Sequence, residues 1–153
     1  MSTWLIVEET STNLSFFFDI MIAHNDFKLN TNKKFQIIDI TSKINELIAI
    51  EEGIVNIFSK HSTSAIVVNE NEKGLLEDFE FMFENLIDEK YSWQHDRIDN
   101  NATSHLKSFL LSSSETLPVK NSKLDLGTWQ SVFFVELDGP RSSRTVNLTF
   151  IGK

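Results

Sequence analysis

The sequence Phe58-Ser59-Lys60-His61-Ser62-Thr63-Ser64-Ala65-Ile66-Val67-Val68-Asn69-Glu70-Asn71 determines how the rest of the chain is interpreted. An apolar run lies on each side of a histidine and three hydroxyl residues, and the stretch ends in two amides that flank a carboxylate. Its β-branched and aromatic residues predict two strands, 54–58 and 65–68, with one polar cluster between them and another where the second strand ends. Strand ends often present functional side chains, so both clusters are candidate sites.

Length and composition favour one domain over residues 1–153. The chain has 153 residues, 41% of them hydrophobic, which is enough for a core of its own. It has no cysteine, so disulfides, thiolate metal sites and cysteine nucleophiles are excluded and a reducing compartment is permitted. The start Met1-Ser2-Thr3-Trp4 lacks the pattern of a signal peptide, and no apolar stretch is long enough to span a bilayer. We therefore expect a cytoplasmic protein with no membrane partner.

The charge balance argues against nucleic acid as a partner. The formal net charge of -8 opposes attraction to phosphate backbones, and arginine is scarce. Only Arg97, Arg141 and Arg144 have the planar guanidinium that grips phosphate in a bidentate manner. Arg141 and Arg144 follow the end of a predicted strand, so either is a candidate ligand contact.

The N-terminal third predicts mainly strands. Residues 4–7 and 14–20 are β-rich, and three consecutive phenylalanines at 16–18 need cover on both faces, which a subunit contact would provide. His24 and the polar stretch to Lys34 predict a loop with a surface histidine. A short strand at 35–38 is followed by a helix that Asp39 or Thr41 caps and that ends before Gly53.

Beyond Asn71 the apolar period changes to three and four residues, which predicts an amphipathic helix at 73–88 with its acidic residues facing water. A second helix is expected at 102–111, with cap candidates at 99–101. Strands follow at 116–119, 128–136 and 144–151. The turn signal Asp138-Gly139-Pro140 predicts that the last two form a hairpin closing the sheet. Alternation places Gln130 and Glu136 on one strand face and Trp129 on the other.

Three of the four histidines, His61, His95 and His105, lie at the ends of predicted elements. Neutral imidazole is a common metal ligand, and three imidazoles leave a coordination position open for water or substrate, as a catalytic zinc site requires. Their spacing is no recognised motif, however, and ordinary loop histidines are common. The three hydroxyl residues after His61 suit either an anion or a turn. Both readings stay open on the residues alone.

The combination of motifs resembles one family. The segments that carry the resemblance are His61-Ser62-Thr63-Ser64-Ala65, Asn69-Glu70-Asn71, Tyr91, His95, His105-Leu106-Lys107-Ser108, Leu126-Gly127-Thr128-Trp129-Gln130 and Glu136. In this order, over about residues 35–152, the chain resembles the YjbQ-like family, described as secondary thiamine-phosphate synthases. The resemblance implies a compact α+β domain with a mixed or antiparallel sheet and two to three helices. It also implies a homotrimer whose histidines gather in a polar pocket near a subunit boundary.

The implied reaction joins a pyrimidine diphosphate to a thiazole phosphate, which needs a divalent cation or arginines on the leaving diphosphate. The resemblance then assigns Glu70 and His61 to catalysis, and His61, His95 and His105 to a divalent metal ion, zinc or magnesium. It assigns the phosphorylated substrate to Ser62, Thr63, Ser64, Asn69, Asn71, Gln130 and Arg141. Glu136 and Asp99 are expected to support the histidines.

Two departures from the family pattern affect the carboxylates. Glu72-Lys73-Gly74 stands where members carry an acidic Asp-Pro segment, and Ile98-Asp99-Asn100-Asn101 stands where they carry Gly-Pro-Asp-Asp. One acidic position is lost in the second loop, so Asp99 is the best remaining candidate there.

Two rival functions accompany the synthase. Three histidines around a metal suit water activation better than a magnesium-diphosphate site, where carboxylates dominate. A metal-dependent hydrolase or lyase of a small phosphorylated molecule, with Glu70 as general base, is therefore one alternative. A non-catalytic trimeric protein that binds a small ligand is the other, and it would show affinity without turnover.

Overall fold

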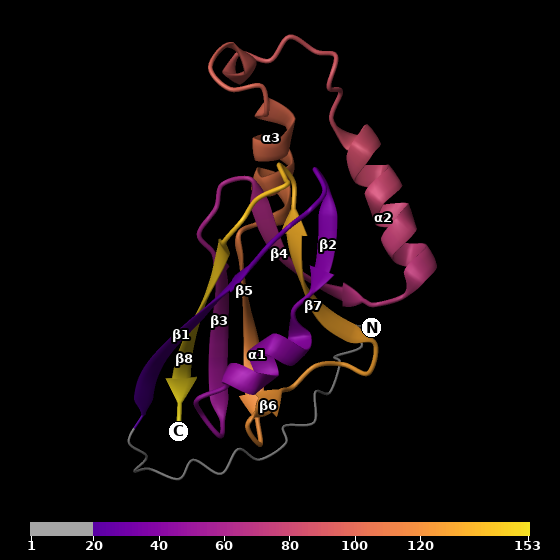
Figure 1. Ribbon diagram of the computed structural model, residues 1–153. Coiled ribbons are helices and arrows are strands. Elements are labelled where there is room, and N and C mark those ends of the chain that lie inside the picture. Colours follow the sequence, from indigo (N-terminus) through magenta and orange to yellow (C-terminus); the bar gives the residue numbers. More distant parts are fainter. Residues whose placement is uncertain (1–19) are drawn as a thin grey trace, which may run out of the picture.

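Residues 20–153 are the part of the chain that the structure, a computed structural model, describes; they form two antiparallel sheets and three α-helices (Figure 1). The strands of the larger sheet are β1 (Met21–Leu29), β3 (Gly53–Ser59), β5 (Ser114–Lys120), β6 (Lys123–Leu124) and β8 (Arg144–Gly152), and those of the smaller sheet are β2 (Gln36–Asp39), β4 (Ser64–Glu70) and β7 (Gln130–Glu136). The larger sheet has the order β1-β8-β3-β5-β6 and the smaller one β2-β7-β4. The predicted α+β class is confirmed.

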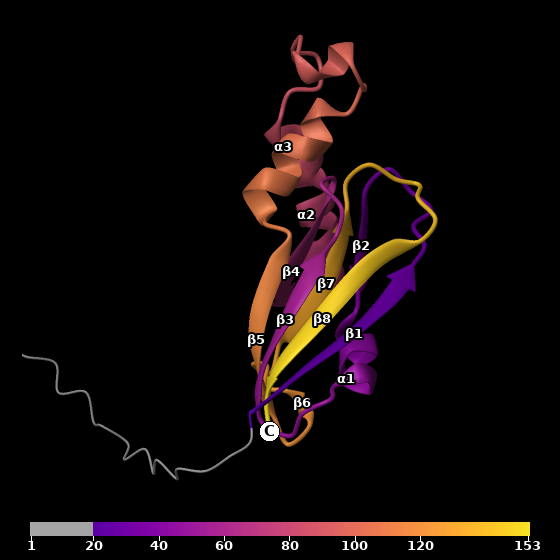
Figure 2. The ribbon, with the colours of Figure 1, turned by 90° about the vertical axis from the view of Figure 1, so that its left-hand side faces the viewer.

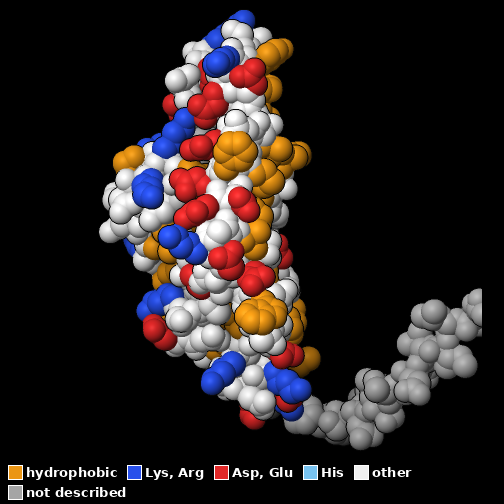
Figure 3. Space-filling model, turned by 90° about the vertical axis from the view of Figure 1, so that its right-hand side faces the viewer, with side chains coloured by type: hydrophobic (Ala, Val, Ile, Leu, Met, Phe, Trp, Pro, Cys, Tyr) orange, Lys and Arg blue, Asp and Glu red, His pale blue; other side chains and the backbone are white. Residues whose placement is uncertain are grey.

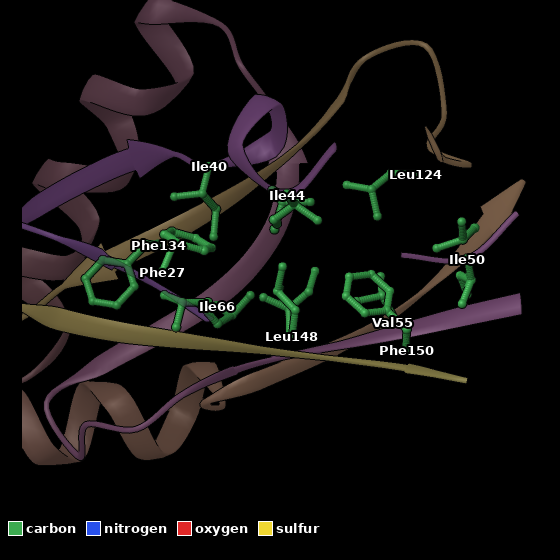
Figure 4. Close-up of a cluster of buried hydrophobic side chains, with 14 residues drawn as sticks. Phe27, Ile40, Ile44, Ile50, Val55, Ile66, Leu124, Phe134, Leu148 and Phe150 are labelled. Atoms are coloured by element: carbon green, nitrogen blue, oxygen red, sulfur yellow. The ribbon is translucent and has the colours of Figure 1, made fainter. Parts of the chain in front are cut away.

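The hydrophobic core lies between the two sheets (Figure 4). Alternation along β8 turns Val146, Leu148 and Phe150 inward, where all three are fully buried. They share one cluster with Phe134 of β7 and with Ile44. Full burial of side chains of this size stabilises the fold by roughly 1.5–3 kcal/mol each, so this cluster is the main source of stability.

The helices cover the ends and one outer face of this sandwich. Helix α1 (Thr41–Leu47) buries Ile44 at one end of the core, and Asp39 accepts a hydrogen bond from the Thr41 backbone N–H at its start. Helices α2 (Lys73–Leu86) and α3 (Ala102–Leu111) lie beside the smaller sheet (Figure 2). The carboxylate of Glu72 caps α2 by accepting from two backbone N–H groups, each at 2.8 Å. No helix within residues 20–153 is long and apolar enough to cross a membrane.

Most predicted elements are found. The two strands of the opening stretch are β3 and β4, the predicted helix 102–111 is α3, and the predicted helix 73–88 ends two residues early at Leu86. Asn101 begins α3 without a side-chain cap, and Asp96 from the short 3-10 helix η1 (His95–Arg97) accepts from Ala102 N at 2.9 Å instead. The strand expected at 4–7 lies outside the described residues, and so does the one expected at 14–20, three phenylalanines included, except for Ile20, which precedes β1.

Two predictions about connections are wrong. The stretch 24–34 is a loop only in its second half, because residues 21–29 form β1 and pair with β8, while 30–34 connect β1 to β2. Its polar side chains face solvent at an edge strand, which removes the apolar pattern that identifies a strand; His24 itself is exposed, as expected. The strands β7 and β8 do not form a hairpin, because β7 pairs with β2 and β4 whereas β8 pairs with β1 and β3. The turn at Asp138-Gly139-Pro140 carries the chain from one sheet to the other.

Candidate functional site

His61 lies in the four-residue connection between β3 and β4, where the backbone of β8 fixes its ring. Its Nε2 accepts a hydrogen bond of 2.7 Å from the backbone N–H of Thr145. The Lys60 N–H in turn donates to the Thr145 carbonyl. Because the Nε2 lone pair is used, a neutral ring carries its hydrogen on Nδ1. His61 is therefore positioned as a hydrogen-bond donor through Nδ1.

The electrostatic surroundings keep this ring neutral. Burial lowers the pKa of His61 below its ordinary value, and the positive charge of Arg144 lowers it further, while Glu136 partly opposes them. The lowered pKa and the hydrogen bond from Thr145 both favour the neutral ring, because a protonated ring has no lone pair to accept from the Thr145 N–H.

A buried ion pair lies behind His61. Glu136 is fully buried at the end of β7, and Arg144 at the start of β8 is 6% exposed. Arg144 donates from Nε to Glu136 Oε2 and from Nη2 to Glu136 Oε1, and the same Nη2 also donates to Thr63 Oγ1 at 3.1 Å. Thr31 Oγ1 also donates to Glu136, at 2.9 Å. Burial raises the pKa of Glu136, but the bonds from Arg144, Asp138 N and Thr31 outweigh it and hold the pKa below its ordinary value.

The three hydroxyl residues after His61 have different surroundings. Thr63 is buried and bonded to Arg144, and Ser64 is buried, shares a hydrogen bond with the Ser59 hydroxyl and donates to the His61 carbonyl. Ser62 is exposed, and its side chain has no hydrogen-bond partner among the described residues. Of the three, Ser62 is the one that is free to contact a ligand.

A groove of about 740 Å³ opens between residues 58–62 and α3. We call it the His61 groove; its polar lining includes Lys60, His61, Ser62, His105, Ser108 and Ser113. Helix α3 presents His105 to the groove, and Ser108 fixes the helix to β4 by donating to the Ser64 carbonyl at 2.7 Å. Phe58 and Phe109 give the groove apolar walls, and Phe109 is 87% exposed. These two exposed phenylalanines form an apolar rim, and the polar lining has both buried groups, such as Ser108, and exposed ones, Lys60 and Ser62.

His95 and His105 lie together at the N-terminal end of α3. Their ring centroids are 4.8 Å apart and the rings meet edge to face. His105 also lines the His61 groove, whereas His95 does not, so the structure brings His105 into one groove with His61 and into ring contact with His95. Residues 20–153 contain no group of three or more His, Cys, Asp or Glu side chains arranged to hold a metal ion. The donor set fits a metal poorly at His61 in particular, because coordination through Nδ1 would require the ring to give up its bond from Thr145 N.

The second polar cluster lies at the other end of the smaller sheet. Glu70 pairs in register with Gln130, whose Oε1 accepts from Gly127 N at 2.8 Å. Asn71 donates to Asp39, and Asn69 accepts from the Glu70 backbone N–H. Six residue steps along β4 separate Glu70 from Ser64, which is about 20 Å of extended chain. Within one chain the structure therefore does not bring Glu70 or Gln130 to His61.

Arg141 and Asp99 lie in a third place, around the start of α3. Arg141 is exposed and pairs with Asp138 at 2.6 Å. Asn101 bridges the two carboxylates, donating to Asp138 at 3.1 Å and to Asp99 at 3.3 Å. These residues hold the loop after β7 against α3, and neither Arg141 nor Asp99 lines the His61 groove.

Sequence reasoning did not identify Arg144 and the Thr145 N–H as the groups that position His61. A signal for Arg144 was present: it has the same parity as Val146, Leu148 and Phe150, which places a charge on the buried face of β8. A buried charge requires a partner, and Glu136 is the acidic residue on the matching face of β7. The bond from Thr145 is made by backbone and has no sequence signal.

The chain matches known sequences over most of its length. Residues 25–153 match the family model of the UPF0047 protein YjbQ-like family. The chain is 49% identical over 131 residues to a UPF0047 protein of Methanothermobacter thermautotrophicus, covering 84% of this chain and 91% of that one. It is 33% identical over 136 residues to UPF0047 protein YugU of Bacillus subtilis, covering 82% and 96%.

Solved structures give the same result. A YbjQ-like protein of unknown function from Sulfolobus solfataricus superimposes with a TM-score of 0.84 at 39% identity, covering 88% of this chain and 99% of that one. A hypothetical protein of Aeropyrum pernix superimposes with a TM-score of 0.81 at 36% identity, covering 86% and 99%.

These names correct the activity expected from the sequence. The relatives are named as UPF0047 proteins, and the Sulfolobus protein is described as one of unknown function. No thiamine-phosphate synthase is among them, so the assignment of that reaction to this chain is wrong. The family resemblance itself is confirmed.

Proposed function

Since the chain belongs to the YjbQ-like UPF0047 family, whose relatives named above carry no stated reaction, we propose a function from its own geometry: the His61 groove binds a small phosphorylated molecule. The observation that carries this proposal is the 2.7 Å bond from Thr145 N to His61 Nε2. It leaves a neutral imidazole with its Nδ1–H as the free group, and phosphate oxygens are acceptors for such donors.

Other groups of the groove support the same ligand. The ammonium of Lys60, the free hydroxyl of Ser62 and the ring of His105 all belong to its lining. Hydroxyl and imidazole donors around one cation form a usual environment for a single phosphate group. The net charge of -8 opposes a polyanion, so the ligand should be small, with its phosphate at the base of the groove and its remainder against Phe58 and Phe109.

Titration calorimetry with phenyl phosphate tests this proposal. We expect one binding site per chain and an affinity at least about tenfold weaker in His61→Ala, because a charge-assisted hydrogen bond contributes about 1.5–3 kcal/mol. His24→Ala is the matched control, since His24 is exposed on β1 and lies outside the groove. An unchanged affinity of His61→Ala for phenyl phosphate would refute the proposal. A urea denaturation curve of the same variant shows whether it is folded.

A divalent ion is a second candidate occupant of this region, favoured by one observation. The rings of His95 and His105 lie with centroids 4.8 Å apart, and His105 belongs to the groove. Two imidazoles can hold a zinc ion whose other positions are filled by water or ligand. Elemental analysis of the purified protein, with and without chelator, tests it. We expect His105→Ala to remove any bound metal and His61→Ala to leave it, because Nε2 of His61 is already engaged by Thr145.

Three expectations stay predictions: the homotrimer, the absence of nucleic-acid and membrane partners, and the cytoplasmic location. What supports assembly is the exposed apolar surface of α3 beside the groove, where Phe109 and Leu110 are 87% and 64% exposed.

A further inference from the structure

A second polar pocket contains a buried lysine. Lys107 of α3 has a side chain that is only 9% exposed, and it lines a cavity of about 390 Å³ between α3, α2 and the loop before β2. The other lining residues are Lys33, Lys34, Phe35, Glu80, Glu84, Glu89 and Leu137. Lysine is rarely buried unless it is paired, so the partners of this ammonium need to be found.

The protein provides Lys107 with too few acceptors. Its nearest carboxylate oxygen is Glu89 Oε1, 3.8 Å from Nζ, which is longer than a hydrogen bond. The same oxygen already accepts from Lys34 Nζ at 3.2 Å. Burial lowers the pKa of Lys107, and the charge of Lys34 lowers it further, while Glu89 and Glu84 offset this only in part. Donors of Lys107 therefore remain available inside the cavity.

The opposite wall carries carboxylates that water can reach: Glu84 is exposed and Glu80 is half-buried. Glu80 and Glu84 of α2 line the cavity, and neither forms an ion pair or hydrogen bond with another residue in the part of the chain that the structure describes. Figure 3 shows the face over α2, where acidic side chains gather and basic side chains lie along one edge. The cavity thus has a buried ammonium on α3, and on α2 it has two carboxylates that no residue of 20–153 pairs; Glu84 also attracts Lys107 through its charge.

The walls that carry these groups are held in place. Gly139 N donates to the Lys34 carbonyl at 2.9 Å, and a Cβ at Gly139 would lie 2.1 Å from the Lys33 carbonyl oxygen, so only glycine permits this contact. Ser104 of α3 donates to the Leu137 carbonyl at 2.6 Å. The cavity is therefore a fixed feature of the fold, with its cationic side set by α3 and the loop before β2.

We propose that this cavity binds a small zwitterion that carries a carboxylate at one end and an amine at the other. Its carboxylate would accept from Lys107 and Lys34, and its amine would donate to Glu84 and Glu80. A zwitterion would match both kinds of charge in a cavity lined by three lysines and three glutamates, whereas a simple anion would match the lysines alone. The cavity shares no lining residue with the His61 groove, so the two sites are separate.

Titration calorimetry with ω-aminocarboxylates of increasing length tests the proposal. The probes are glycine, β-alanine, 4-aminobutyrate and 6-aminohexanoate, with butyrate and butylamine as the two half-molecules. We expect one of the longer probes to bind at least about tenfold more tightly than either half-molecule, because each half satisfies one wall only. A series in which butyrate binds as tightly as the zwitterions, or in which no probe binds saturably, would overturn the proposal.

Substitutions test which residues on the two walls of the cavity bind the zwitterion. Lys107→Met should weaken zwitterion binding at least about tenfold while phenyl phosphate binding in the His61 groove stays unchanged; methionine fills a similar volume without a buried charge. Glu84→Gln should weaken the zwitterion and leave butyrate unaffected. Lys90→Met, on an exposed lysine outside the cavity, is the matched control. If Lys107→Met is poorly folded, Lys34→Met at the more exposed partner gives the same test. Wild-type affinity in both lysine variants would refute the site.

Discussion

The two ends of the paired strands β4 and β7 carry similar polar residues in very different surroundings: Ser64 pairs with Glu136 at one end, and Glu70 with Gln130 at the other. At the Ser64 end, Glu136 is fully buried with Arg144, and this pair holds Thr63 beside the His61 connection. At the Glu70 end, the register partner Gln130 is exposed, and within residues 20–153 its side chain bonds only to the Gly127 N–H of its own turn. Polar residues that are buried and paired fix a site from behind, whereas exposed ones stabilise a local turn.

Glu136→Gln should have the largest effect on the free energy of unfolding. Removing one partner of a buried ion pair leaves the Arg144 charge uncompensated, which costs about 3–5 kcal/mol. Urea denaturation measures the loss, and Glu70→Gln at the other end of the sheet is the matched control, expected to lie within about 0.5 kcal/mol of the parent. Equal effects at both ends would remove the distinction between them.

Phe109→Asp tests whether the apolar rim at the His61 end is a subunit contact. Phe109, Leu106 and Leu110 line a continuous, mainly apolar groove of about 460 Å³ beside the His61 groove. Burying a phenylalanine in an interface contributes about 1.5–3 kcal/mol, so the charge should shift the assembly towards single chains of 17.6 kDa. Light scattering across concentrations measures this shift.

Trp129→Asp is the comparison at the other end. Trp129 is 73% exposed, and its neighbours Thr128 and Gln130 are exposed and polar. We expect the mass to change less than in Phe109→Asp, because an isolated aromatic residue is common on free surfaces. A monomeric parent protein at every concentration would refute the predicted homotrimer altogether.

The sequence predicted the local elements better than their connections. The strands β3, β4 and β8 and the helix α3 follow from alternation and period, because burial on one face leaves that signal directly in the chain. The edge strand β1 was missed because solvent covers one of its faces and polar residues replace the pattern. The β7–β8 connection was missed because a turn signal does not specify which sheet the chain enters next.

The candidate site shows the same limit. Position on a strand end identified His61, but the direction of its ring depends on the Thr145 backbone, which lies 84 residues away in sequence. Nothing in the sequence separates Thr63 and Ser64 from Ser62, yet their hydroxyls are already hydrogen-bonded to Arg144 and Ser59, respectively. Which polar side chains remain free for a ligand is decided by tertiary pairing, and a single sequence does not contain it.

The pH dependence of stability should separate the His61 end from the rest of the fold. Because the folded-state pKa of His61 lies below its ordinary value of 6.5, the unfolded chain binds more protons as the pH falls through that value. Stability is therefore full above about pH 6.5 and decreases as the pH falls towards the folded pKa. Urea denaturation at several pH values measures the slope, and His61→Ala should reduce it, with His24→Ala as the control. An unchanged slope in His61→Ala would show that the ring does not contribute.

The smallest expected effect is that of Gln130→Ala, and it bears most directly on how the two ends are related. The variant loses one hydrogen bond on an exposed turn, so the free energy of unfolding should fall by about 0.5–1.5 kcal/mol. Phenyl phosphate affinity should not change, because Gln130 pairs with Glu70 at the far end of β4, about 20 Å of extended strand from Ser64 beside the His61 connection. Calorimetry on the folded variant checks this. A tenfold loss of affinity would mean that the Gln130 end of one chain meets the His61 end of another. Glu70, which pairs with Gln130, would then belong to the same shared site, and mixing His61→Ala chains with Gln130→Ala chains should restore part of the binding.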